Sequence, residues 1–142
     1  MNYVKWAFVA LAGYTFVAPL MKVATAPGGI PATVAALVAN TVLVVASVGV
    51  VLYSGIPVLE YATHPRMLYV LAAGVCLAVG ILAYYEALSR GPVSVVVPVF
   101  GMFLVTSSLV SVLWLGDDLT LRKVAGIGFA IAAVYLTAGP RA

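Results

Sequence analysis

The sequence predicts an all-α integral membrane protein with five transmembrane helices. Apolar residues make up 65% of the 142 residues and charged residues only 8%, whereas about a quarter of the residues in a soluble domain are charged. The mean hydropathy is +1.20. Because so few charged side chains cannot cover a soluble fold, we expect nearly all of the chain to lie in lipid.

Five long apolar segments follow one another, each close to the roughly 20 residues that a helix needs to cross a hydrocarbon core of about 30 Å. Short connections rich in Gly and Pro, which end helices, separate them. None of these connections is long enough for an extramembrane domain, so we expect one domain over residues 1–142. The predicted helices are Tyr3 to Thr25, Pro31 to Tyr53, Met67 to Ser89, Val93 to Leu115 and Leu121 to Ala138.

Two other interpretations of these segments fit less well. A backbone in lipid must satisfy its own hydrogen bonds, and runs such as "VLVVASVGVVLY" lack the alternation of a transmembrane β-strand, which favours helices. The first segment has Lys5 ahead of an apolar run and small residues at 24–26, as a secretory signal does. Lys22 interrupts that run and Pro27 follows it, so we expect the segment to be retained as a helix.

The first two segments each carry a polar side chain near the bilayer midplane. Asn40 lies about nine residues into the second segment, or about 14 Å from its start, and Tyr14 is similarly deep in the first. Carrier sites tend to lie at this depth, so both residues are candidates for substrate contact. Both would serve equally well as hydrogen-bonding groups between helices. Lys22, nearer its helix end, is expected to extend to the interface.

The third segment carries Glu86 about 4.5 Å from its end, if the helix runs to Ser89. Arg90 follows four residues later, the spacing at which an acid and a base pair well on a helix. An interfacial ion pair is one interpretation. The other is a carboxylate that faces a cavity, because acids within membranes often handle ions or protons. The sequence leaves both open.

Small residues form a stripe on the third segment and another on the fifth. Such stripes let helices approach closely in lipid, where no hydrophobic driving force holds helices together, so we expect both to be packing faces. The residues are Ala72, Cys76, Gly80, Ala83 and Ala87 on the third segment, and Gly126, Ala130, Ala133 and Thr137 on the fifth.

The fourth segment contains Pro98, which frees a backbone carbonyl that hydroxyls or a cavity must satisfy. We expect the hydroxyls in its second half to bond mainly to carbonyls of their own helix, and we retain Ser108 among them as a candidate substrate contact. Asp117 and Asp118 precede the fifth segment, where carboxylates cap free amides and meet the positive end of the helix dipole.

The basic residues are scattered around the segment ends, which is typical of topology signals and not of a nucleic-acid-binding face. With five spans, four lie on the N-terminal side and three on the other. So small a bias favours either one orientation or insertion in both, and the latter would give an antiparallel homodimer related by an axis in the membrane plane. The residues are Lys5, Arg66, Arg122 and Lys123 on the first side, and Lys22, Arg90 and Arg141 on the second.

No enzyme signature is present in the sequence. The single histidine, His64, lies beside Pro65 without a cysteine or carboxylate cluster at metal-ligand spacing, and no phosphate loop or activated nucleophile is found. We therefore expect no catalytic activity, no cofactor and no metal site. Aromatic residues near the segment ends are expected at the membrane interfaces, namely Trp6, Tyr53, Tyr61, Tyr69 and Trp114.

Three stretches carry a family resemblance: "GYTFVAPLMKVA", "YYEALSRGPVSVVVPV" and "SVLWLGDDLTLRKVAGIGFAIAAVYLTA". Together they resemble an EamA-type repeat of the drug/metabolite transporter superfamily, most specifically from Gly80 to Ala138. Members usually join two such repeats with inverted topology into ten helices that move small organic solutes across the inner membrane by alternating access. Short members are thought to pair, with helices one to four of each repeat around a central cavity. This chain departs from the pattern in having Asn40 where many repeats have arginine, and Asp117 where Glu is usual.

The sequence therefore predicts one half of a ten-helix inverted-repeat carrier. We expect a secondary transporter subunit for small organic solutes, paired as a homodimer in the inner membrane, with proton coupling as an option. Its expected partners are membrane lipid, a small-molecule substrate and a second copy of the chain. The alternative is a non-transporting membrane subunit that packs against another membrane protein. The candidate substrate-binding residues are Tyr14, Asn40, Glu86 and Ser108.

Overall fold

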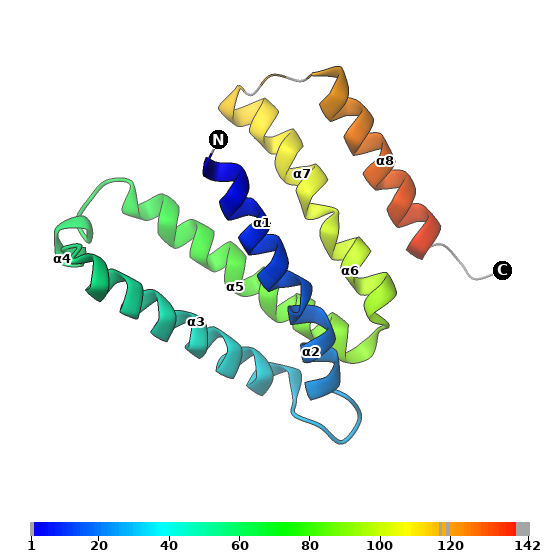
Figure 1. Ribbon diagram of the computed structural model, residues 1–142, viewed down its shortest axis with the longest axis horizontal. Coiled ribbons are helices and arrows are strands. Elements are labelled where there is room, and N and C mark those ends of the chain that lie inside the picture. Colours follow the sequence, from blue (N-terminus) through cyan, green and yellow to red (C-terminus); the bar gives the residue numbers. More distant parts are fainter. Residues whose placement is uncertain (1, 117, 119, 139–142) are drawn as a thin grey trace. The chain divides into compact units, whose positions relative to one another are not determined.

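The computed structural model describes residues 2–116, 118 and 120–138, and every regular element in that range is a helix (Figure 1). The prediction of an all-helical chain is confirmed for these residues. The chain forms two compact units, one ending at Arg90 and the other beginning at Gly91. That all 142 residues form a single domain stays a prediction.

The first unit contains the first three predicted membrane segments. Its helices α3 and α5 run side by side with the short α4 in their connection, and α2 packs on α5 (Figure 1). The helices are α1 (Asn2–Thr15), α2 (Val17–Ala24), α3 (Ala32–Ser54), α4 (Val58–Tyr61) and α5 (Met67–Arg90).

A break at Phe16 separates α1 from α2. Pro19 has no N–H to donate to the carbonyl of Thr15, four residues earlier, and its ring crowds that carbonyl. The helix therefore ends at Thr15 and resumes one residue later, where the Leu20 N–H donates to the Phe16 carbonyl at 3.1 Å. The span from Tyr3 to Ala24 has nearly the predicted extent, and the break at Phe16 within it was not predicted.

The turn between α2 and α3 depends on two glycines. Gly28 has a φ of 82°, which side chains disfavour. The N–H of Gly29 donates to the Ala26 carbonyl at 2.7 Å, and the N–H of Ile30 donates to the Ala24 carbonyl at 2.8 Å. A Cβ atom on Gly29 would stand 2.5 Å from that Ala24 oxygen. The tight turn therefore excludes a side chain at Gly29, and it brings the end of α2 close to the start of α3.

The buried side chains of the first unit lie at one end of its helices. They come from α2 and the residue that follows it, the first turns of α3, and the last turns of α5, where the side chain of Leu88 is fully buried. The remaining lengths of α1, α3 and α5 are largely exposed to their surroundings. The unit is therefore packed at one end, around Ala18, Met21, Thr25, Ala35, Ala36, Tyr84, Tyr85 and Leu88.

The second unit contains the fourth and fifth predicted segments. Pro92 precedes its first helix with a ψ of 139°, so the chain enters that helix from an extended residue. α6 packs on α8, and the fourth segment is divided into three consecutive helical pieces. The elements are α6 (Val93–Gly101), α7 (Phe103–Val110), the π-helical turn η1 (Ser111–Leu115) and α8 (Leu121–Ala138).

The breaks in the fourth segment have local causes. Pro98 cannot donate to the carbonyl of Ser94, which weakens the turn before the break. The helix is interrupted at Met102, whose N–H donates to the Val99 carbonyl at 3.2 Å, only three residues earlier. At the far end η1 stops at Gly116, which has a φ of 71° and so favours glycine.

Among the described residues, four helical stretches are long and apolar enough to cross a membrane: Tyr3–Ala24, Ala32–Ser54, Met67–Arg90 and Val93–Trp114. They coincide with the first four predicted spans to within one residue at each end. The fifth predicted span is helical as α8, which has 18 residues and is therefore about 27 Å long. That α8 crosses the membrane stays a prediction.

Three residues of the small-residue stripes are open within the described part of the chain, so that both stripes are packing faces stays a prediction. Cys76 is exposed, and no atom lies within 4 Å of the position a Cβ would take at Gly80 or Gly126. The buried residues of α5 are Tyr84, Tyr85 and Leu88, and α5 packs against both α2 and α3.

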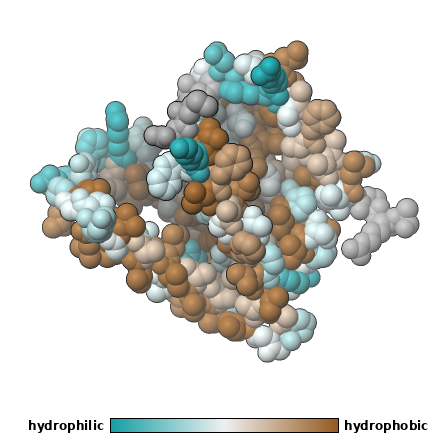
Figure 2. Space-filling view, in the orientation of Figure 1, coloured by the Kyte–Doolittle hydropathy of each residue, from teal (hydrophilic) through white to brown (hydrophobic). Residues whose placement is uncertain are grey.

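Figure 2 shows the distribution of hydropathy on one face of the chain. Hydrophobic side chains extend along the helices, and hydrophilic ones gather around the α4 connection and the start of α8. The five aromatic residues expected at the membrane interfaces are all exposed in the chain, consistent with contact with lipid headgroups.

Candidate functional site

Glu86 and Arg90 form an ion pair on the last turns of α5. Arg90 Nε donates to Glu86 Oε1 at 2.8 Å, and its Nη2 donates to the same oxygen. The side chains are 45% and 80% exposed, so the pair lies at the rim of the unit. The spacing of four residues predicts this pair, and the structure contains it.

Lys22 joins two helices of the first unit. Its Nζ donates to the carbonyl of Leu88 at 2.9 Å and to that of Ser89 at 3.3 Å. These are orphan carbonyls of the last turn of α5, where the helix dipole also favours a cation. Lys22 therefore caps α5 from α2 and is half-buried, whereas the sequence predicts a side chain extended to the interface. The sequence offers no signal for this contact, because its partners are backbone atoms 66 and 67 residues away.

Asn40 and Tyr14 differ in their surroundings. The half-buried Asn40 donates from Nδ2 to the carbonyl of Ala36 at 2.8 Å, so this donor is used within its own helix, α3. Tyr14 is 68% exposed on α1.

Two buried tyrosines on α5 were not predicted from the sequence. The rings of Tyr84 and Tyr85 have centroids 5.9 Å apart and an interplanar angle of 38°. Both are at least 90% buried, in the part of the unit where α2 meets α5. Their position just before Glu86 in the chain was visible, but burial of adjacent residues on one helix is set by tertiary packing.

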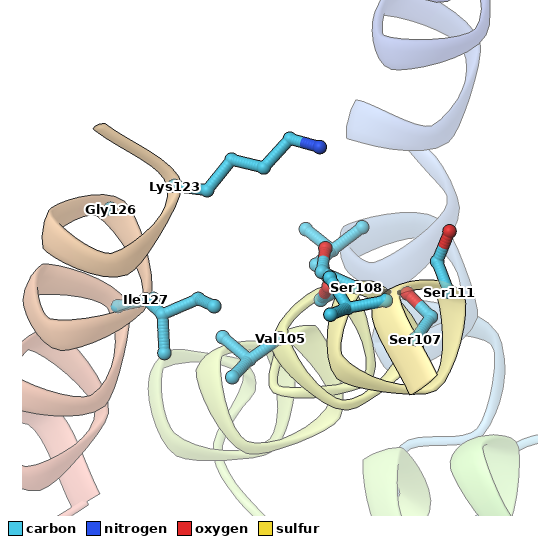
Figure 3. Close-up of a pocket in the computed structure, with 10 residues that line it drawn as sticks. Val105, Ser107, Ser108, Ser111, Lys123, Gly126 and Ile127 are labelled. Atoms are coloured by element: carbon cyan, nitrogen blue, oxygen red, sulfur yellow. Dashed lines mark hydrogen bonds between the residues drawn. The ribbon is translucent and has the colours of Figure 1, made fainter. Parts of the chain in front are cut away.

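Ser108, the fourth predicted site residue, lines a pocket in the second unit. The pocket has a volume of about 540 Å³ and lies between α7 and η1 on one side and α8 on the other (Figure 3). Ser107, Ser108 and Ser111 come from the first wall, and Lys123 and Gly126 from α8. In Figure 3 the Lys123 side chain reaches from α8 toward the serine-bearing helix.

The hydroxyls of α7 bond to their own helix, as the sequence predicts. Ser108 Oγ donates to the Leu104 carbonyl at 2.7 Å, Ser107 Oγ donates to the same carbonyl at 3.1 Å, and Thr106 Oγ1 donates to the Phe103 carbonyl at 3.2 Å. Each oxygen keeps acceptor capacity in these positions. Ser108 thus has both a local bond and a place on the pocket wall.

The cap of α8 corrects another expectation. Thr120 Oγ1 accepts a bond from the Lys123 N–H at 3.4 Å, which is the N-cap arrangement. Asp118 lies two residues before this cap, and Lys123 Nζ donates to its main-chain oxygen at 2.8 Å. Among the described residues the side-chain cap is therefore Thr120 and not Asp118, although α8 begins at Leu121 as predicted. Asp117 lies outside the described residues.

The sequence matches the family described as the EamA-like transporter family over residues 1–139. The chain belongs to the EamA family. No curated protein and no solved structure matches it. Membership makes it a multi-pass membrane protein of a transporter family in the drug/metabolite superfamily, which agrees with its four apolar spans.

The EamA match covers all four predicted site residues. Tyr14, Asn40 and Glu86 belong to the first unit and Ser108 to the second. In the first unit, Glu86 lies on the last turns of α5, whereas Asn40 lies in the interior of α3, so their depths differ along the helices. That these residues bind substrate stays a prediction for this EamA chain.

Proposed function

We propose that the protein is a subunit of a secondary transporter that moves small organic solutes across the inner membrane by alternating access. The observation that carries this proposal is the EamA match over residues 1–139, supported by four helices long enough to span the membrane. Transporter families of this kind use the free energy of solute or ion gradients. A charged side chain within a membrane-spanning helix can couple transport to such a gradient, and Glu86 lies four residues before the end of the span Met67–Arg90.

Two copies of the chain form the working transporter in this proposal. The first unit buries few side chains and leaves most of α1, α3 and α5 exposed, which supports a second set of helices as their partner. The near balance of basic residues on the two faces supports insertion in opposite orientations, which produces an inverted pair. Helices from both copies then surround one cavity.

The substrate contacts in this proposal are Tyr14, Asn40, Glu86 and Ser108. Asn40 donates one side-chain N–H to the Ala36 carbonyl, so its Oδ1 can accept and its second N–H can donate a hydrogen bond to a solute. Tyr14 offers a ring face and a hydroxyl on an exposed helix surface. This set suits a small solute with both apolar and hydrogen-bonding parts.

Proton coupling is assigned to Glu86. In the observed state its carboxylate is held by Arg90. Protonation of the carboxylate removes the attraction and frees the Arg90 side chain, so the two states differ in the charge that they present to a second copy. Such a difference is what a coupled carrier requires.

Uptake by the purified protein in vesicles tests the proposal. A panel of small organic solutes is measured with and without a pH gradient, for wild type, Glu86→Gln and the matched control Glu60→Gln. Glu60 is an exposed carboxylate in α4, outside the proposed site. We expect the gradient to accelerate uptake in wild type and Glu60→Gln but not in Glu86→Gln. The same gradient dependence in all three removes Glu86 from the mechanism, and no uptake of any solute contradicts transport.

Orientation is tested separately by single-cysteine labelling of intact cells. Cys76 is replaced first, and one cysteine is then added at each terminus in turn. Labelling of both termini from outside supports the inverted homodimer. A single orientation contradicts it and requires a different partner chain.

The alternative function is a non-transporting subunit that packs against another membrane protein. The open stripe around Cys76 and Gly80 on α5 suits close approach of a foreign helix as well as that of a second copy. Uptake by the purified chain alone distinguishes the two, since a packing subunit gives none.

A further inference from the structure

The pocket of the second unit changes character along its length. Lys123, Ser111 and the apolar Val112 lie nearest the turn that joins η1 to α8, and Ser107, Ser108 and Gly126 follow. The opposite end is apolar and is lined by Leu104, Val105, Ile127 and Ala130. Its volume of about 540 Å³ falls within the range of about 300–1,000 Å³ for ligand sites.

The polar end lies at the end of a membrane-spanning segment. The fourth span ends at Trp114, which is 84% exposed, and Lys123 is the third residue of α8. At 1.5 Å per residue, Ala130 lies about 10 Å farther along α8 than Lys123. The pocket therefore runs from the depth of lipid headgroups, where Trp and Lys residues concentrate, into the depth of acyl chains.

Lys123 is the charged residue among those that line the pocket, and it brings a cation to the polar end. Lys123 Nζ donates one bond, to the main-chain oxygen of Asp118 at 2.8 Å, and an ammonium group has three donors. The ion pair found in the described part of the chain is Glu86–Arg90, so no described carboxylate neutralises Lys123 there. Arg122 adds a second positive charge next to it in the sequence, and the exposed Asp118 in the preceding turn adds a negative one.

We propose that this pocket binds an anionic phospholipid of the surrounding bilayer. The phosphate lies at Lys123, and one acyl chain lies along Val105, Ile127 and Ala130. Small side chains at Gly126 and the serines keep the space open, and basic pockets between transmembrane helices bind anionic headgroups in this way. Free phosphate suits the pocket less well, because the apolar end offers it no hydrogen bonds.

Lipid binding by the purified protein in detergent tests this proposal. Retained lipid is counted by native mass spectrometry after titration with phosphatidylglycerol or with phosphatidylcholine of the same chains. We expect phosphatidylglycerol to bind more tightly, and Lys123→Gln to weaken it about fivefold, the effect of one basic residue near a membrane surface. The matched control is Arg122→Gln, which removes the same charge one residue away and does not line the pocket.

A second pair of variants tests the pocket itself. Gly126→Leu places a side chain in the pocket, since no atom lies within 4 Å of the Cβ position, and Gly128→Leu makes the same change outside the pocket, also in open space. We expect Gly126→Leu to abolish the preference for phosphatidylglycerol and Gly128→Leu to retain it, with helicity by circular dichroism unchanged in both.

Three results overturn the proposal. Equal losses in Lys123→Gln and Arg122→Gln indicate general surface electrostatics. Competition by millimolar inorganic phosphate indicates an anion site without an acyl chain. A loss of dimer in Gly126→Leu with lipid binding unchanged indicates that a second copy of the chain fills the pocket. None of these results depends on transport, so the proposed function stands or falls separately.

Discussion

Replacement of Lys22 by Met tests whether the contact between α2 and α5 stabilises the first unit. Methionine keeps an unbranched apolar side chain but removes the donors to the carbonyls of Leu88 and Ser89. Hydrogen bonds between transmembrane helices contribute about 0.6 kcal/mol on average and up to about 1.7 kcal/mol. A charged donor roughly doubles the strength of a neutral one.

The two distances set the expected size of the effect. The bond to Leu88 at 2.9 Å has good length, whereas the bond to Ser89 at 3.3 Å is long and contributes less. We therefore expect Lys22→Met to lower the free energy of unfolding by about 1–3 kcal/mol. The variant also removes the desolvation cost of a half-buried ammonium group, which keeps the estimate below the sum of two full charged bonds.

The assay is unfolding of the purified protein in mixed detergent micelles, followed by circular dichroism, with hydrogen exchange of the last turn of α5 as a local readout. Lys5→Met is the matched control, because Lys5 lies exposed on α1. We expect faster amide hydrogen exchange at Leu88 and Ser89 in Lys22→Met, but not in Lys5→Met. Equal stability and equal exchange in wild type and Lys22→Met would refute a stabilising role for the contact.

Three further predictions concern packing and backbone geometry. Leu88→Ala is expected to lower the free energy of unfolding by about 0.5–2.5 kcal/mol. This is the usual cost of Leu→Ala without the free energy of transfer from water, which a helix in lipid does not gain. Leu71 is exposed, and Leu71→Ala is expected to change stability by less than about 0.5 kcal/mol in the same unfolding assay. Gly29→Ala is expected to lower the unfolding midpoint because its Cβ meets the Ala24 carbonyl. Gly13 lies in open space on a helix, so Gly13→Ala is expected to raise the midpoint and to add up to about 1 kcal/mol to the free energy of unfolding. Midpoints that move in the same direction in both variants contradict this prediction. Pro19→Ala is expected to restore the hydrogen bond to the Thr15 carbonyl and to slow amide hydrogen exchange in the residues next to position 19. Unchanged amide exchange in these residues would show that the break has another cause.

The extents of the helices were largely predictable because lipid requires long uninterrupted apolar runs. Met67–Arg90 differs from its predicted range by one residue, and Ala32–Ser54 differs by one at each end. The Glu86–Arg90 pair was equally accessible, since four residues along a helix fix the geometry. The break at Phe16 was missed although Pro19 marks it in the sequence.

The tertiary features were not predictable from a linear pattern. The cap by Lys22 depends on where α2 crosses α5, and the burial of Tyr84 and Tyr85 depends on the same crossing. The small-residue stripes predicted close packing, but periodicity identifies a face without identifying its partner. The pocket beside Ser108 depends on how α7 and η1 face α8, which no spacing in the sequence indicates.

The one-sided burial around Leu88 has a mechanical consequence. A helix of 24 residues such as α5 is about 36 Å long, so a tilt of about 10° about its anchored end displaces the opposite end by about 6 Å. Few internal contacts resist that swing, because the side chains along the remaining length touch little within the unit. The packed end can therefore stay intact as a pivot while the opposite ends of the helices of the first unit move apart or together.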